Sequence, residues 1–259
     1  TDHDAILDEA ALATAFEICP PKVVIVNHGS NVFGGVLPIV TISRMSHFYN
    51  ALFIVGAAQT IGFADLDMER QGIDMLIFTG HKNLYGPIGI GGLILNREVE
   101  LKPTIFGGTG SNSALETMPS IYPQRLEPGS QNGVAIVGLA SGLSYIQEHA
   151  DLKMRELLIF QKLLSILQEY PELRLYYSSD EDQRLPIVSC ACRRYSPQNL
   201  GVMLEQSANI AVRVGLHCAP QAHEFFGASA NGMVRFSLSI FNDEEDVKVL
   251  AQALYNIFY

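Results

Sequence analysis

Short apolar runs that alternate with helical segments constrain the fold of this chain more than any other feature. Four such runs are bounded by turn-forming residues: Val23–Val26, Leu52–Val55, Met75–Phe78 and Gly92–Leu95. Apolar runs of this length are typical of strands that are buried on both faces. Two segments with helical periodicity, Leu37–Tyr49 and Ala64–Gln71, separate the first three runs. This alternation predicts an α/β fold with a mainly parallel sheet covered by helices.

The pattern changes near residue 145. Helical periodicity covers residues 134–149 and 152–170, and shorter elements follow. We expect strands over Leu173–Tyr177, Ile187–Cys192, Ile210–Val214 and Met233–Ile240, and helices over Pro197–Gln206 and from Glu244 onward. The sequence therefore predicts a large α/β domain over residues 1–145 and a small C-terminal α+β domain over residues 146–259.

The carboxyl ends of the predicted parallel strands are where an open sheet of this kind binds its ligands. Here those ends are Asn27–His28, Gly56–Gln59 and Thr79–Lys82. Lys82 directly follows a buried strand, where burial would lower the pKa of its amine. An amine that bonds covalently to a cofactor carbonyl needs such a pKa. By itself, the Gly-His-Lys triplet favours a lysine in a surface loop, and only the surrounding pattern reverses that preference.

Charge and composition exclude some classes of partner. The net charge of −10 would repel a nucleic-acid backbone, and no basic run offers a local exception. No apolar stretch approaches the roughly 20 residues that a membrane helix needs, and the acidic opening Thr1–Asp4 is unlike a signal peptide. The four cysteines are too scattered for a disulfide scaffold. We therefore expect a cytoplasmic protein with reduced thiols, which binds neither nucleic acid nor membranes.

Four motifs occur in an order and at spacings that are typical of one protein family: Asn27–Asn31, Ala57–Gln59, Thr79–Lys82 and Arg213–Pro220. Together they resemble the class V aminotransferase fold family, within it the cysteine desulfurase and selenocysteine lyase branch. The resemblance runs from about Val23 to the C-terminus. It implies the aspartate aminotransferase-like fold of the transferases that depend on pyridoxal 5'-phosphate (PLP), with PLP as the cofactor.

The resemblance also implies roles for residues around PLP. Lys82 would bond to PLP as a Schiff base, and Thr79 and His81 match residues that bind its phosphate. Gln59 matches the residue that hydrogen-bonds the ring hydroxyl group. Asn31 would contact the substrate carboxylate near the cofactor.

Two further residues would act on the substrate. Arg235 would bind its carboxylate through two hydrogen bonds. A surface salt bridge is the alternative for Arg235, but its place inside an apolar strand argues against that. Cys218 would be the nucleophile that takes sulfur from cysteine and becomes a persulfide, and positive charge near it, beside His217, would favour its thiolate. We expect the other cysteines to be structural, and Cys190 and Cys192 to form no metal site because no other ligands lie nearby.

A long segment rich in Gly, Ser and Pro, residues 106–132, lacks any hydrophobic period. Ser130 in this segment matches a position at which members of the family reach across a dimer interface to the partner's PLP phosphate. The resemblance therefore implies a homodimer. Gly107–Ser113 is consistent both with a flexible connection and with an active-site loop.

Two departures from the family pattern bear on activity. Gly56 stands where the family has an aspartate that keeps the pyridine nitrogen of PLP protonated, and the freed space could hold water. The family's Gly-Thr-Thr phosphate loop and its ring-stacking histidine have no equivalent here. We therefore expect this chain to be the C-terminal portion of a longer protein whose N-terminal segment is missing.

The expected function is a PLP-dependent cysteine desulfurase, which converts L-cysteine to L-alanine and transfers sulfur to Cys218, with activity impaired by the truncation and by Gly56. A selenocysteine lyase or another class V enzyme is the alternative among enzymes. The alternative to an enzyme is a non-catalytic homologue that serves as a dimerisation or sulfur-acceptor module. The expected partners are cysteine or selenocysteine, a second copy of the chain and a sulfur-acceptor protein.

Overall fold

The first half of the chain forms a four-stranded sheet with the order β1-β2-β3-β4. β1 (Val23–Asn27), β2 (Leu52–Gly56) and β3 (Met75–Thr79) are parallel, and β4 (Gly91–Leu95) is antiparallel to β3. The computed structural model describes residues 7–96, 99–110, 112–181, 183–228 and 230–259, so Thr1–Asp4 and Ser111 lie outside it. The predicted mainly parallel sheet is confirmed.

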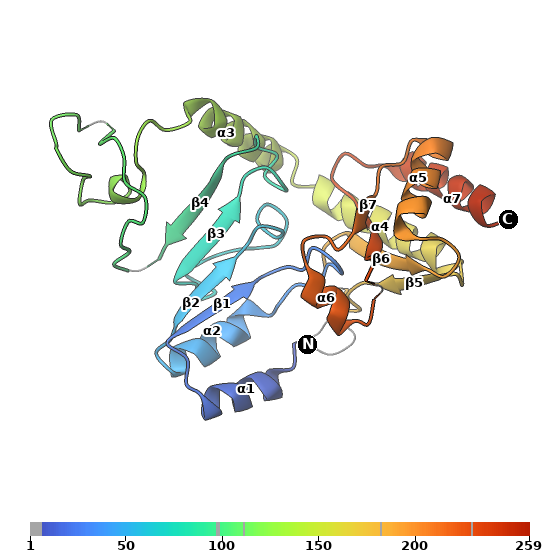
Figure 1. Cartoon of the computed structure of the whole chain (residues 1–259), viewed down its shortest axis with the longest axis horizontal. Coiled ribbons are helices and arrows are strands. Elements are labelled where there is room, and N and C mark those ends of the chain that lie inside the picture. Colours follow the sequence, from blue (N-terminus) through green and yellow to red (C-terminus); the bar gives the residue numbers. More distant parts are fainter. Residues whose placement is uncertain (1–6, 97–98, 111, 182, 229) are drawn as a thin grey trace.

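Two helices cover one face of this first sheet (Figure 1). α1 (Glu9–Ile18) begins after Asp8, whose carboxylate accepts a hydrogen bond from the backbone of Ala11 at 2.9 Å. α2 (Ile39–Phe48) confirms the helix expected over residues 37–49. The core beneath them contains Phe16, Ile39, Ile42, Phe53, Val55 and Leu76, all buried. Burial of these side chains is the main stabilising contribution to this half of the chain.

The opposite face of the first sheet is only partly covered: Ile54 and Met75, in the same row as Ile25, are buried there. Ile25, Ile77 and Leu93 point to this side and are 69%, 47% and 40% exposed. The strand register places Asn27, Gly56, Ile77 and Leu93 in one row across the four strands. We call the face that carries Ile25, Ile77 and Leu93 the open face.

The helix expected over residues 64–71 does not form, and this prediction is wrong: the segment is a series of turns. Polar side chains there bond to nearby backbone groups. The backbone of Asp67 donates to the side chain of Gln71 at 2.9 Å, and the backbone of Arg70 donates to Asp67 at 2.8 Å. Such local bonds compete with the hydrogen bonds of a helix.

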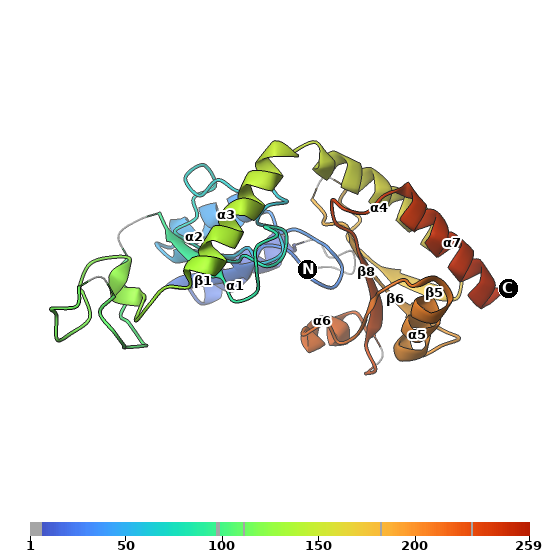
Figure 2. The ribbon, with the colours of Figure 1, turned by 90° about the horizontal axis from the view of Figure 1, so that it is seen from above.

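The second half of the chain forms an antiparallel sheet with the order β5-β6-β8-β7. Its strands are β5 (Leu173–Tyr176), β6 (Ile187–Cys192), β7 (Arg213–Gly215) and β8 (Met233–Ser237). α4 (Leu152–Gln168), α5 (Pro197–Ala208) and α7 (Glu244–Phe258) supply the core on one face, and α6 (Pro220–Phe225) lies on the other side. Figure 2 shows α4 and α7 lying side by side over this sheet.

Two predicted strands in this half differ from the structure by three residues, and one helix was not expected. The strand expected over residues 210–214 is observed at Arg213–Gly215, and the strand expected over residues 233–240 ends at Ser237. The unexpected helix is α6. α3 (Gly133–Glu148) and α4 are separated at residues 149–151, and the domain boundary at residue 145 stays a prediction. Among the described residues, no helix has the length and apolar character needed to cross a membrane.

Candidate active site

The loop that carries Lys82 is held tightly between the first sheet and α3. The backbone of Gly80 donates to Ile90 at 2.9 Å, and that of Gly86 donates to Gly80 at 2.8 Å. α3 packs closely on the loop, because a Cβ atom at Gly142 would lie only 2.2 Å from the carbonyl oxygen of Leu84. Lys82 is therefore presented by a rigid turn at the carboxyl end of β3.

Lys82 lies in the field of charges from the second sheet. Partial burial lowers the pKa of its amine, and the positive charges of Arg235 and Arg213 lower it further, while Cys218 acts in the opposite direction. A lowered pKa brings an amine closer to its neutral, nucleophilic form. Arg213, Cys218 and Arg235 all belong to β7, β8 or the loop between them. The candidate site thus combines residues of both sheets.

The other predicted cofactor residues lie at the strand ends of the first sheet. The Thr79 hydroxyl and Nδ1 of His81 are 2.7 Å apart, and both side chains are accessible. Asn83 Nδ2 donates to the backbone carbonyl of Gln59 at 2.6 Å, which ties the loop after β2 to the loop of Lys82. A hydroxyl group and an imidazole at such an edge are suitable donors for a phosphate.

Asn31 connects the two sheets. Its carbonyl oxygen accepts a hydrogen bond from Nη1 of Arg235 at 2.9 Å, and its Nδ2 donates to the carbonyl oxygen of His217 at 2.6 Å. Nε of Arg235 is buried without a hydrogen-bond partner, and Arg235 forms no ion pair with any described residue. A half-buried guanidinium group with unused donors is suited to binding a carboxylate. The surface salt bridge considered for Arg235 is not observed.

Cys218 is exposed and lies just after β7. Nη2 of Arg213 donates to its Sγ at 3.2 Å. Cys218 and His217 have φ angles of +59° and +52°, a left-handed conformation that costs such residues energy and is concentrated at functional sites. Sequence reasoning gave Arg213 no role, although it begins the motif that contains Cys218.

His217 is not the source of positive charge beside Cys218, contrary to expectation. It is buried, and burial, reinforced by Arg235, His223 and Arg213, lowers its pKa to about 4. His217 is therefore neutral at pH 7. The positive charge next to the thiol comes from Arg213 instead.

Asn31 and Cys218 line one cavity of about 510 Å³, together with Ser30, Phe33 and Pro220. Of the described residues that line it, none is Lys82, Gln59 or Arg235. The link between Lys82 and this cavity is therefore the charge coupling to Cys218 and the two arginines.

Gly56 lies beside the side chain of Asn27. In the sheet Asn27 is its register partner, and a Cβ atom at position 56 would lie 2.9 Å from Oδ1 of Asn27. The amide of Asn27 is therefore the polar group next to the position where the family has a carboxylate. The expectation that the space freed by Gly56 could hold water stays a prediction.

Ser130 does not join the other predicted residues. It is exposed on the long connection between β4 and α3, which contains the short 3-10 helix η1 (Gln124–Leu126). This connection projects away from both sheets in Figures 1 and 2. Within one chain, Ser130 and Lys82 are therefore on separate parts of the molecule.

Comparisons with known proteins identify a family and a fold that this chain matches. The family model described as aminotransferase class-V matches residues 2–250. A probable cysteine desulfurase from Methanothermobacter thermautotrophicus is 29% identical over 99% of this chain and 65% of its own length. Another from Aeropyrum pernix is 34% identical over 91% of this chain and 60% of its own length. The chain thus spans less than two thirds of the length of these relatives.

A solved structure is also similar. The apo structure of cysteine desulfurase from Thermococcus onnurineus superposes with a TM-score of 0.89 at 28% identity, and the match covers 99% of this chain and 64% of that one. A cysteine desulfurase from Escherichia coli shares the fold, with a TM-score of 0.86 at 22% identity. The predicted fold class is confirmed.

Proposed function

The chain belongs to the class-V aminotransferase family, and from this premise we propose that it carries most of the active site of a PLP-dependent cysteine desulfurase. The substrate is L-cysteine, and the products are L-alanine and a persulfide on Cys218. One observation carries the proposal. Asn31, at the strand ends of the first sheet, accepts a hydrogen bond from Arg235 and donates one to the carbonyl of His217, the neighbour of Cys218. In agreement with this, the charges of Arg235, Arg213 and Cys218 act on the pKa of Lys82.

The residues present fit PLP on three sides. Lys82 offers an amine, Thr79 and His81 offer donors for the phosphate at the end of β3, and Gln59 lies on the adjacent loop that Asn83 secures. The fourth side, at Gly56, offers the neutral amide of Asn27 in place of a carboxylate. When bound, PLP supplies an electron sink for breaking bonds at the substrate's carbon atoms.

Each remaining residue has a task in this proposal. Arg235 holds the substrate carboxylate with its unused donors, and Asn31 orients Arg235 through its carbonyl oxygen. Nζ of Lys82 accepts and returns protons because its pKa is lowered. Sγ of Cys218, beside Arg213, bonds to the substrate sulfur while the carbon–sulfur bond breaks. The electron pair stays on carbon, which takes up a proton and gives alanine.

We propose further that two copies of the chain pair, with Ser130 of each projecting loop completing the site of the other. The exposed position of Ser130 and the extension of its loop away from both sheets support this. An exposed Cys218 also suits transfer of sulfur to an acceptor protein. All four cysteines are free, which is suited to the reducing cytoplasm that we propose as its location.

Reconstitution of the purified chain with PLP tests this proposal. We expect a visible absorbance band from lysine-bound PLP, and sulfide and alanine after addition of cysteine. Lys82→Ala should remove the band, and Cys218→Ala should remove persulfide and sulfide but keep the band. Cys19→Ala is the matched control, because Cys19 is also an exposed free cysteine. A band without any sulfide in the unmodified protein would favour a non-catalytic homologue, consistent with Gly56.

A further inference from the structure

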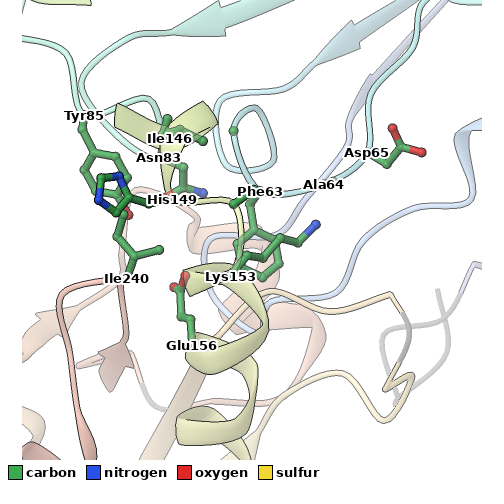
Figure 3. A pocket seen from close by; sticks show the side chains of 12 residues that line it. Phe63, Ala64, Asp65, Asn83, Tyr85, Ile146, His149, Lys153, Glu156 and Ile240 are labelled. Carbon is green, nitrogen blue, oxygen red and sulfur yellow. The ribbon is translucent and has the colours of Figure 1, made fainter. Parts of the chain in front are cut away.

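A second cavity, of about 210 Å³, lies at the junction of the two halves of the chain (Figure 3). Its walls come from the turn after β2, the loop that follows Lys82, the adjoining ends of α3 and α4, and Ile240. None of the residues that line it is Lys82, Cys218, Arg235 or another residue predicted to contact PLP or substrate. Its volume is many times the roughly 10–15 Å³ that one water molecule requires.

Glu156 on α4 is the most unusual residue of this cavity. Glu156 is only 4% exposed, and its carboxylate points into the cavity in Figure 3. It forms no hydrogen bond or ion pair with any residue that the structure describes. Burial raises its pKa to about 7, against the opposing charge of Lys153. Burying an ionised carboxylate without a partner costs free energy, so a polar group of a ligand that bonds to Glu156 would lower that cost.

Lys153, one turn earlier on α4, supplies the opposite charge. Its Nζ lies 5.0 Å from the centre of the Phe63 ring and forms no ion pair with the described part of the chain. In Figure 3 its amine is directed toward Phe63 and away from the Glu156 carboxylate. Asp65 also lines the cavity, but its carboxylate pairs with Arg70 at 2.5 Å. Glu156 and Lys153 are thus the charged lining residues that form no ion pair within the described part of the chain.

The remaining walls are suited to a small organic molecule. Phe63, Tyr85, Ile146 and Ile240 provide apolar surface, and Asn83 and His149 provide polar atoms. Aromatic faces beside a carboxylate favour an organic ammonium group. Ligand sites are commonly apolar cavities with a few polar groups that fix orientation.

We propose that this cavity binds a small zwitterion of the α-amino acid class, with the ammonium group against Glu156 and the carboxylate toward Lys153. The site is separate from the one proposed for catalysis and does not depend on that assignment. It lies directly behind it, because Asn83 lines the cavity and also holds the carbonyl of Gln59 at 2.6 Å.

Calorimetric titration of the full chain in the Lys82→Ala, Arg235→Ala background tests the proposal, because those changes remove amino-acid binding at the candidate active site. The probes are L-serine, ethylamine, which carries only the ammonium group, and acetate, which carries only the carboxylate. We expect saturable binding of serine at millimolar concentration or below, at least tenfold weaker binding of ethylamine, and none of acetate.

Variants then assign the two charges. Glu156→Gln keeps the size of the side chain, and we expect it and Lys153→Met each to weaken serine binding at least tenfold. Glu148→Gln, an exposed change near the end of α3, should leave binding unchanged. No binding of serine, equal binding of serine and ethylamine, or unchanged binding in Glu156→Gln would each overturn the proposal. Thermal melting of each variant confirms that it is folded.

Discussion

The two sheets of this protein differ in how completely they are covered. β6 of the second sheet is buried on both faces: Val188 and Cys190 pack into the helical core, and Ser189 donates to the carbonyl of Val32 on the other side. In the first sheet, α1 and α2 cover one face, whereas the open face exposes Ile25, Ile77 and Leu93. An apolar strand is therefore buried on both faces in the second sheet, as β6 is, whereas in the first sheet β1 is buried on one face and exposed on the other.

This difference separates the two sides of the candidate site. Arg235 projects from the fully covered sheet and is fixed by Asn31. Gly56 and Asn27 lie in a row that crosses the open face and continues to exposed Ile77. A row of exposed apolar side chains is typical of surface that another segment or chain covers. The side of the candidate site at Arg235 is thus held by contacts within this chain, and the side at Gly56 is the less constrained one.

The largest effect should come from the covered sheet. Phe160 of α4 is fully buried in its core, so Phe160→Ala should lower the free energy of unfolding by about 3–5 kcal/mol. Leu158, on the same helix but 54% exposed, is the matched control. Leu158→Ala should change the free energy of unfolding by less than about 0.5 kcal/mol. Denaturant titration measures both. Equal losses in the two variants would show that this core is not the stabilising unit.

The junction between the two halves should show a pH dependence. In the folded state Glu156 has a pKa of about 7, against an ordinary value of 4.5, because it is buried. The folded state therefore holds this proton more tightly, so its contribution to stability is full below pH 4.5 and is lost as the pH rises to about 7. With about 1.36 kcal/mol per pKa unit, the loss is on the order of 3 kcal/mol.

Comparison with Glu156→Gln isolates this contribution. His28 and His217 have pKa values lowered to about 4 by burial, and they change stability with pH in the opposite direction. Both proteins share that effect. The stability of Glu156→Gln relative to the unmodified protein should therefore rise between pH 4.5 and 7, as measured by unfolding at several pH values. A constant difference would contradict the buried position of Glu156.

A smaller effect is expected where the candidate site meets the open face. Gly56→Asp should destabilise the fold by up to about 1 kcal/mol, because its Cβ would meet Oδ1 of Asn27, the end of an exposed side chain that can move aside. Asn27→Ser removes the obstruction, so the double variant should recover most of the loss. Melting temperatures measure this coupling, and the absorbance of bound PLP reports the added carboxylate. Strictly additive effects would mean that the two side chains do not meet.

The sequence predicted elements that depend on local apolar patterns, such as β6, whose bounds Ile187–Cys192 are as expected. It failed where side chains bond to the backbone, as Gln71 does, and where an element is as short as α6. The motif around Lys82 predicted a site between strand ends. The roles of Asn27 and Glu156 could not be predicted, because they depend on a cross-strand register and on the contact of α4 with a distant loop.

The smallest effect should come from the open face itself, where two adjacent residues of β1 provide an internal comparison. Ile25 is 69% exposed, whereas Val24 points to the covered face and is 9% exposed. Threonine keeps the β-branched shape that favours a strand, so substitution changes mainly the burial of a polar group. Val24→Thr buries a hydroxyl group and should cost about 1–3 kcal/mol.

Ile25→Thr should instead change the free energy of unfolding by less than about 0.5 kcal/mol, because its hydroxyl group remains in water. Denaturant titration of the two variants at several protein concentrations measures this difference. If a second copy of the chain covered the open face, Ile25→Thr would cost as much as Val24→Thr, and the loss would grow with protein concentration because association stabilises the folded state. Equal and concentration-dependent losses would therefore show that the first sheet, like the second, is covered on both faces in solution.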